Sequence, residues 1–249
     1  MNHMSIPRVL RTPVPVPQSA HCPRCIVRDA CAPAGADASG AGAVDVLAGY
    51  RRRLERDDTL LRRAQPLVAL YVVRLGHLKA TRPDRHGQPH VTAFHMAGDL
   101  IGLDAICAGH HACTVVALED SEVCAIPYPE FQDALRASSQ LMQRFHCAMS
   151  HEIVREQAAL IQANTPAAER LAGFLLSLSA RYAERGLSPN RFRLHMSRAD
   201  IGNHLGLALE SVSRLLTRFR DLGWIELDKR ELVLRDPDKL EALLTAVPA

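Results

Sequence analysis

The sequence has few lysines, few aromatic residues and no long apolar run. Of its 30 basic residues only three are lysines, so arginine carries almost all of the positive charge. The formal net charge of +3 excludes a strongly basic field over the whole molecule, so any signal for nucleic-acid binding must be local. No segment approaches the roughly 18 apolar residues that cross a bilayer, and the first 20 residues lack the apolar core of a secretion signal. We therefore expect a cytoplasmic protein with no membrane partner.

Three of the seven cysteines lie close together near the amino terminus, at Cys22, Cys25 and Cys31. The segment 22–43 around them is small, polar and without periodicity, so something other than an apolar core must hold it. In a reducing compartment, such a thiol cluster favours an iron–sulfur cluster or zinc over disulfides, with one further ligand elsewhere. Histidines could supply that ligand to zinc. The candidates are His21, His110 and His111.

Hydrophobic patterning divides the 249 residues into a strand-rich region followed by helices. Between Leu67 and Pro127, short apolar runs alternate with turn residues, which is typical of an antiparallel β-sandwich or jelly roll. From Tyr128 the apolar spacing becomes helical. One long helix is expected to end near Asn164, before the break at Thr165-Pro166. We expect the apolar stripe of this helix to pack against a partner helix.

Residues 197–219 predict a helix-turn-helix. Ser197 and Asp200 form a helix-start signal, and Gly206 turns the chain into a second helix with a core-facing stripe. The opposite face of this second helix carries three polar residues near its amino end, where a recognition helix meets base edges. They are Glu210, Ser213 and Arg214. Alternating runs at 224–227 and 232–234 predict a hairpin wing.

The charge of this region supports the same interpretation. From Arg191 to Arg220 there are six arginines and only two acidic residues, a local net charge of +4. The alternative is a pair of packed surface helices with solvated arginines.

The strand-rich region followed by helices predicts the fold class α+β, in four parts. These are 1–45, an N-terminal arm and cysteine loop; 46–135, a β-sandwich sensory domain; 136–165, the long helix; and 166–249, a winged helix-turn-helix DNA-binding domain.

Several motifs together cover nearly the whole chain from residue 22 to the predicted wing. They are C-x2-C-x5-C at 22–31, FHMAGDLIGLDAI at 94–106, the pair His110-His111, VCAIP at 123–127, IGNHLGL at 201–207 and E-x2-SRLL at 210–216. These motifs resemble the fumarate and nitrate reduction regulator (FNR) branch of the cyclic-AMP receptor protein (CRP) superfamily. The resemblance implies a cyclic-nucleotide-binding-like sandwich, a long dimerisation helix and a winged helix-turn-helix.

The resemblance also implies a cofactor and its ligands. In that family three amino-terminal cysteines and a fourth in the β-domain hold one [4Fe-4S] cluster, and the fourth maps onto Cys124 by its flanking residues. The ligand set would be Cys22, Cys25, Cys31 and Cys124. The remaining cysteines match no ligand, so we expect small buried thiols there. They are Cys107, Cys113 and Cys147.

By the same resemblance, the chain would be an oxygen-responsive homodimer that binds double-stranded DNA without oxygen and works with RNA polymerase. Glu210 would accept from a cytosine amino group and Arg214 would read guanine, with Ser213 between them, on a palindrome of TTGAT-like half-sites. Ile153 and Glu156 share a face of the long helix. Ile153 would supply apolar dimer contact, and Glu156 would keep the cluster-free chain monomeric through like-charge repulsion. The family carries Asp rather than Glu there.

Two departures from the family bear on these expectations. No Lys or Arg occurs between His86 and Leu135, so the phosphate of cyclic AMP would meet no cation, and cyclic AMP is not expected as effector. Residues 60–68 lack the family's Gly-containing strand pattern, so an irregular sandwich is expected there. Regulators that respond to nitric oxide or general redox state, or that carry zinc, remain alternatives on the same scaffold. An enzyme is not expected, because no nucleophile–base pair, phosphate loop or substrate motif occurs.

Overall fold

The computed structural model describes residues 50–162 and 164–245. The predicted cysteine loop, with Cys22, Cys25 and Cys31, lies outside the described residues. The chain divides into two compact units, with the boundary between Glu152 and Ile153.

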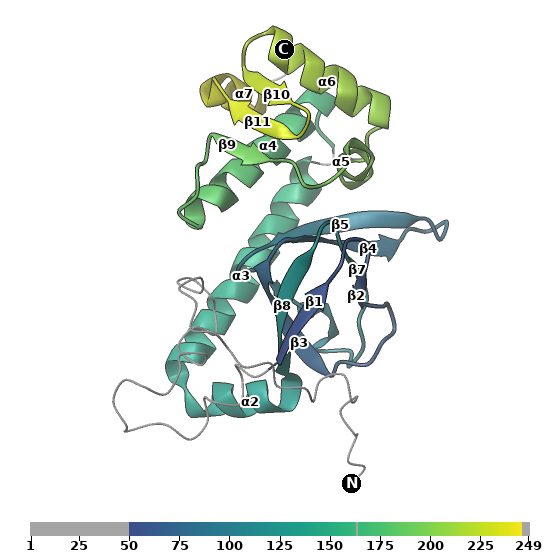
Figure 1. Cartoon of the computed structure of the whole chain (residues 1–249), viewed down its shortest axis with the longest axis vertical. Helices are drawn as coiled ribbons and strands as arrows, with labels where there is room; N and C mark the ends of the chain where they lie inside the picture. The colour runs from purple at the N-terminus through teal and green to yellow at the C-terminus, as the bar shows by residue number, and fades with distance from the viewer. Residues whose placement is uncertain (1–49, 163, 246–249) are drawn as a thin grey trace. The chain divides into compact units, whose positions relative to one another are not determined.

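The N-terminal unit contains two antiparallel four-stranded sheets that form a sandwich (Figure 1). The first sheet has the order β1-β8-β3-β6: β1 (Tyr50–Leu54), β8 (Ser121–Pro127), β3 (Ala69–Leu75) and β6 (Leu100–Ile101). The second has the order β2-β7-β4-β5: β2 (Thr59–Leu61), β7 (Thr114–Ala117), β4 (His77–Pro83) and β5 (Pro89–Met96). β2 is short, and its register against β7 shifts between Thr59 and Leu61. The expected irregularity therefore begins in this strand.

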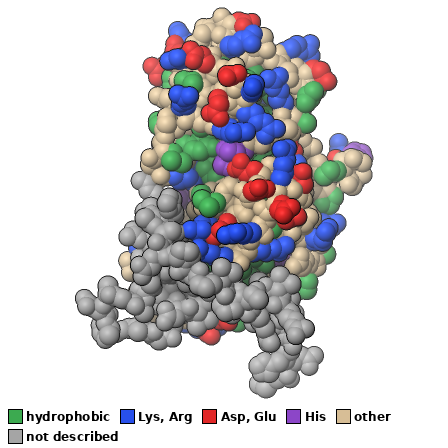
Figure 2. All heavy atoms as spheres, viewed as in Figure 1, with side chains coloured by type: hydrophobic (Ala, Val, Ile, Leu, Met, Phe, Trp, Pro, Cys, Tyr) green, Lys and Arg blue, Asp and Glu red, His purple; other side chains and the backbone are tan. Residues whose placement is uncertain are grey.

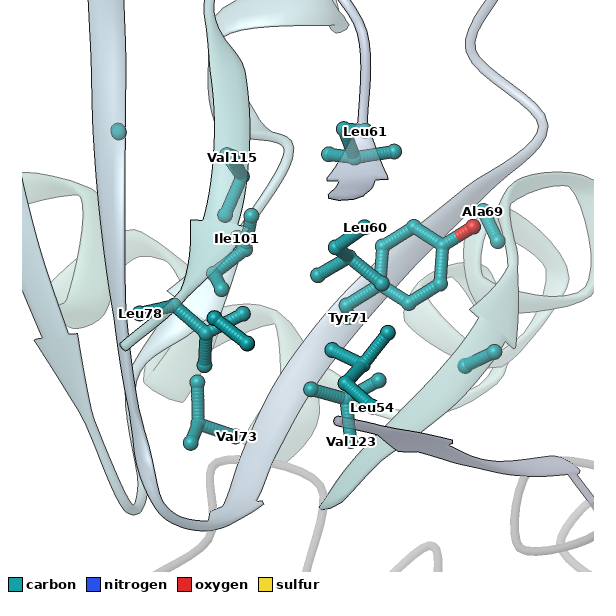
Figure 3. Packing of buried hydrophobic residues seen from close by; sticks show 13 residues of the cluster. Leu54, Leu60, Leu61, Ala69, Tyr71, Val73, Leu78, Ile101, Val115 and Val123 are labelled. Atoms are coloured by element: carbon teal, nitrogen blue, oxygen red, sulfur yellow. The ribbon is translucent and has the colours of Figure 1, made fainter. Parts of the chain in front are cut away.

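The sandwich core lies between the two sheets. Tyr71 and Val73 of β3 and Leu78 of β4 are buried in one apolar cluster, and Figure 3 shows their side chains in the same interior. In β4 the buried residues Leu78 and Ala80 alternate with more exposed ones, because successive side chains of a strand point to opposite faces.

Two helices cover the outer face of the first sheet. A 3-10 helix, η2 (Leu103–Ala105), follows β6, and α2 (Tyr128–Ala137) and α3 (Ser139–Gln162) follow β8. Phe131 of α2 and Phe145 of α3 pack edge to face, with ring centroids 5.2 Å apart, in a second buried cluster that includes Leu70 and Ile126. The sheet is thus buried on both faces at β3 and β8, which explains their nearly continuous apolar sequence.

The C-terminal unit combines helices with a small sheet (Figure 1). Its elements are α4 (Ala167–Glu184), β9 (Arg191–Arg193), α5 (Arg198–Leu205), α6 (Leu209–Asp221), β10 (Ile225–Asp228), β11 (Glu231–Leu234) and α7 (Pro237–Thr245). The sheet order is β10-β11-β9, so the predicted wing hairpin gains a third strand. Leu171, Leu175, Ile201, Val212 and Leu216 are almost fully buried. Within the described ranges, none of the helices is long and apolar enough to cross a lipid bilayer.

Candidate nucleic-acid interface and cysteine site

A capping box formed by Ser197 and Asp200 stabilises the start of α5. The Ser197 Oγ accepts a hydrogen bond from the Asp200 backbone N–H at 3.0 Å, and the Asp200 carboxylate accepts one from the Ser197 N–H at 3.2 Å. Two amide groups that no helical carbonyl can reach are thereby satisfied.

The turn after α5 depends on two glycines. Gly206 ends the helix in the left-handed region with φ of 64°, which favours glycine. The Leu207 N–H then donates to the Gly202 carbonyl at 2.8 Å. A Cβ on Gly202 would lie 2.6 Å from the Leu207 carbonyl oxygen, so no other residue fits there without a shift. The turn is therefore tight, and α6 begins at Leu209.

α6 separates an apolar face from a polar one. Val212, Leu216 and Phe219 are buried, whereas Glu210 and Arg214 are exposed and lie one helical turn apart. The sequence prediction that Glu210 and Arg214 share a face agrees with this geometry. Ser213 is partly buried beside them.

One contact at this face does not follow from the sequence. Arg198, the first residue of α5, donates from its Nη1 to the Ser213 Oγ at 3.3 Å. The sequence marks Arg198 only as one of six local arginines, because no sequence pattern links it to a side chain 15 residues away.

The charges of α6 follow the direction of the helix dipole. Glu210 lies in its first turn, and Arg218 and Arg220 lie in its last. Arg220 is partly neutralised by Asp221, at 2.9 Å from its Nη2. In Figure 2, basic and acidic side chains are interspersed over the visible face, so no field of one sign covers it. Positive charge is thus a local property of a few arginines on this interface.

Cys124 lies in β8, between β1 and β3. It is directly opposite Arg51 on one side and Val72 on the other. Because side chains alternate along a strand, Cys124 shares its face with Glu122 and Ile126. Its side chain is partly exposed. The thiol is therefore on the outer face of the first sheet, outside the sandwich core.

An ion cluster occupies the same face next to Cys124. The Glu122 carboxylate lies 2.6 Å from the Nη1 of Arg74 and 3.6 Å from the Nε of Arg51, and all three side chains are largely buried. Two well-shielded guanidinium groups thus lie beside the Glu122 carboxylate, with the more exposed Arg53 at 3.9 Å. Guanidinium groups on the face of Cys124 suit an anionic group held by cysteine thiolates. The surroundings of Cys124 therefore fit the expected cluster.

The other described cysteines are not all buried. Cys113 is partly buried, and burial, the first cause, raises the pKa of its thiol, with the nearby Asp104 acting in the same direction. Cys107 and Cys147 are exposed, so the expectation of small buried thiols is wrong at these two positions. Cys107 follows η2 in a surface turn, and Cys147 lies on the solvent side of α3.

The two adjacent histidines hold a loop in place. The His110 Nδ1 lies 2.8 Å from the Ala108 carbonyl. His111 is only 1% exposed, and its Nδ1 lies 3.4 Å from the Asp104 Oδ1. The other carboxylate oxygen accepts from the Ala112 and Cys113 N–H groups at 2.7 and 3.1 Å. Burial opposes ionisation of Asp104, but these hydrogen bonds and the His111 charge outweigh it and lower its pKa. The pair fastens the segment after η2.

α3 presents an apolar surface to solvent. Ile153 and Leu160 lie seven residues apart and are 57% and 70% exposed, and Val154 and Ile161 form a second such pair. Glu156 is also exposed, three residues from Ile153. A helix that exposes a stripe of this kind normally buries it against another helix.

Two family profiles match the chain. Residues 51–138 match the cyclic nucleotide-binding domain, and residues 169–243 match the Crp-like helix-turn-helix domain.

Comparison with curated proteins gives relatives along almost the full chain. The chain is 43% identical to the transcriptional regulatory protein btr of Bordetella pertussis over 92% of its own length and 95% of that protein. It is 38% identical to the fumarate and nitrate reduction regulatory protein of Salmonella typhimurium, and 37% identical to that of Escherichia coli K12. Both of these alignments cover 90% of each partner.

Among solved structures, FixK2 from Bradyrhizobium japonicum is similar with a TM-score of 0.72 and 26% identity, over 80% of this chain and 98% of that one. TTHB099, a CRP-family regulator from Thermus thermophilus, is similar in fold with a TM-score of 0.60 and 21% identity, over 78% and 97%. The similarity to these two structures supports a fold in which a β-sandwich, a long helix and a winged helix-turn-helix follow one another along the chain.

Proposed function

Because the chain belongs to the FNR branch of the CRP/FNR family of DNA-binding transcription regulators, we propose that it is oxygen-responsive and acts as a [4Fe-4S]-containing homodimer under anaerobic conditions. The observation that carries the proposal is the position of Cys124 on the outer sheet face, beside Arg51, Arg74 and Glu122. Its relatives are regulators, and the proposal assigns no enzymatic activity.

Cys124 would hold the group together with Cys22, Cys25 and Cys31, which lie outside the described residues. A bound [4Fe-4S] cluster supplies an oxygen-labile redox centre. With four thiolates and a +2 core it carries a net charge of about −2, so Arg51 and Arg74 would favour the bound state. The role of the chain is to present four thiolates and to hold this charge near two cations.

The DNA contacts would come from α6. Glu210 would accept a hydrogen bond from a cytosine amino group, Arg214 would donate to guanine, and Ser213 would lie between them. Two α6 helices in a dimer would enter successive major grooves of a TTGAT-like palindrome, about 34 Å apart. The exposed positions of Glu210 and Arg214 support this assignment.

The dimer would form along α3. Ile153 would contact the second copy, whereas Glu156 would bring like charges together and oppose pairing when the cluster is lost. The four exposed apolar side chains of α3 support a helix–helix seam. RNA polymerase would be the further partner of the DNA-bound dimer. Cyclic AMP would not be the effector, because residues 87–134 contain no Lys or Arg to meet its phosphate.

The decisive experiment is anaerobic purification with metal and sulfide analysis before and after exposure to air, combined with DNA binding at each stage. We expect about four iron and four sulfide ions per chain, which is one [4Fe-4S] cluster. Both the iron and the specific DNA binding should disappear in air. The variant Cys124→Ala should lose iron, and Cys147→Ala, which removes a thiol outside the proposed ligand set, should keep it. Zinc in place of iron, or a full iron complement in Cys124→Ala, would overturn the assignment.

A further inference from the structure

One guanidinium group from α4 reaches the end of α5. The Arg170 Nη1 donates to the Leu205 carbonyl at 2.8 Å and lies 3.4 Å from the Gly206 carbonyl. The side chain is only partly exposed, and its Nε is buried without a hydrogen-bond partner among the described residues. Among the described residues, the Arg170 Nε thus has no acceptor, whereas the Nη1 donates to these two carbonyls.

The carbonyls that Arg170 meets are ones that the helix cannot satisfy itself. The last four carbonyls of an α-helix have no helical N–H partner. In α5 the Gly202 carbonyl accepts from Leu207 at 2.8 Å, and the Asn203 carbonyl accepts from Gly206 at 3.4 Å. Arg170 supplies the partner for the Leu205 carbonyl that follows. It also brings a positive charge to the negative end of the helix dipole.

A second contact from α4 lies one helical turn further along. The Phe174 ring lies 5.8 Å from the His204 ring, measured between centroids. Residues four apart share a helix face, so Arg170 and Phe174 together hold the last turn of α5 at two points. The guanidinium also sits close against the turn, because a Cβ on Gly206 would lie 3.4 Å from the Arg170 Nη1.

The backbone of this turn leads directly into α6. The residue before this helix, Ala208, offers no side-chain hydrogen bond to the first amide groups of α6. The direction of α6 therefore depends on the backbone of 206–208 and on the packing of its apolar face. A contact that holds the Leu205 and Gly206 carbonyls therefore acts on one of the two features that orient the helix with Glu210 and Arg214.

We propose that Arg170 is a positioning residue for DNA readout, which holds the α5–α6 turn and thereby aims α6 at the bases. This inference rests on the proposed DNA site, since Arg170 itself touches neither Glu210 nor Arg214. The proposal concerns the recognition of bases by α6 and not the general attraction to DNA. Loss of Arg170 impairs the match between α6 and base edges more than it impairs attraction to the DNA backbone.

The first test is hydrogen exchange in the DNA-free full-length chain. In Arg170→Met, amide exchange in the turn and the first turn of α6 should become about tenfold faster, because local opening costs less free energy. Arg170→Lys, which keeps a charged donor, should lie between this variant and the parent. Arg235→Met is the matched control, since it removes a charge of the same unit that pairs with Glu226. Unchanged exchange at residues 205–212 in Arg170→Met would overturn the proposal. If Arg170→Met does not fold, Arg170→Gln takes its place with the same criteria.

The second test compares anaerobic binding to a duplex with the TTGAT palindrome and to a scrambled duplex. Arg170→Met should lose about tenfold on the palindrome, comparable to losing one good base contact. Its affinity for the scrambled duplex should match that of Arg235→Met, and Arg170→Lys should recover part of the loss. Equal losses on both duplexes would overturn the positioning role, since they indicate a general charge effect. If the parent chain does not prefer the palindrome, the proposed half-site is wrong, and hydrogen exchange alone decides the role of Arg170.

Discussion

At the scale of single residues, Arg214 carries the most specific expectation. Its guanidinium is exposed on α6 and has the planar donor geometry that pairs with guanine. We expect Arg214→Ala to weaken binding to the specific site by about 1–3 kcal/mol and to relax selectivity at one base pair. Titration against duplexes that vary one base pair at a time checks this. A uniform loss on all sequences, with a shallower salt dependence, would instead make Arg214 a phosphate contact.

Asp104 predicts a pH dependence of stability. Its pKa in the folded chain is lowered, with burial opposed by hydrogen bonds from His111 and two backbone N–H groups. A carboxyl whose folded pKa lies below its unfolded value stabilises the fold at higher pH, and this contribution is lost as the pH falls through the folded pKa.

Asp104→Asn keeps an acceptor but removes the charge, so we expect it to lower the free energy of unfolding by about 1 kcal/mol at neutral pH. The difference from the parent should begin to shrink below the ordinary aspartate pKa of about 4, and it should be lost once the pH falls below the lowered pKa of the folded state. Denaturant titrations of the cluster-free protein at several pH values measure this. A difference that is constant from neutral to acid pH would contradict the assignment.

Some of these residues could be predicted from the sequence and others could not. The shared face of Glu210 and Arg214 follows from helical periodicity, which is local. The guanidinium of Arg74 next to Glu122 depends on strand pairing between residues 48 positions apart, and the Arg170–Leu205 bond joins two helices. No local pattern encodes such contacts. The exposure of Cys107 was mispredicted for the same reason, because burial is set by the neighbours in space.

At the scale of elements, Gly202 in α5 has little room for a side chain. A Cβ there would lie 2.6 Å from a backbone oxygen of the following turn, and backbone cannot move aside as a side chain can. We expect Gly202→Ala to destabilise the C-terminal unit by about 1–3 kcal/mol, the usual size of an overpacking effect. Gly223→Ala is the control, since it meets no atom within 4 Å and only its positive φ opposes the substitution. Thermal unfolding measures the loss of stability of both variants. A smaller loss for Gly202→Ala than for Gly223→Ala would show that the backbone of the α5–α6 turn can shift to accommodate a Cβ.

Elements with a short continuous apolar run are easier to predict than those with mixed composition. Apolar runs at 67–73, 91–94, 113–118 and 122–126 indicate β3, β5, β7 and β8. β4 was not singled out, although Leu78 and Ala80 alternate with polar residues, because its apolar residues never form a run. The sequence does not indicate β1, because Arg51, Arg52 and Arg53 hide its strand character, and the carboxylate that pairs with two of them comes from β8.

At the scale of the whole molecule, the arrangement of sandwich, long helix and winged helix-turn-helix was predictable, since each part has its own periodicity. Assembly adds a prediction at this scale. Glu156→Ala removes the proposed repulsion, so the chain should form dimers and bind its site in air. Ile153→Ala removes apolar contact and should weaken the dimer even with the cluster intact. Sedimentation of both variants measures this, and a Glu156→Ala monomer indistinguishable from the aerobic parent would contradict the role of Glu156.

The exposed apolar stripe of α3 also bears on how steeply such a regulator responds to its own abundance. A palindrome is occupied by pairs, and the second half-site is filled from a high effective concentration once the first is bound. Where pairing is weak, the number of pairs rises with the square of the number of chains, so a halved copy number leaves a quarter of the pairs. The strength of the proposed α3 seam would therefore set how steeply the occupancy of the DNA site falls with copy number, even when the signal is present.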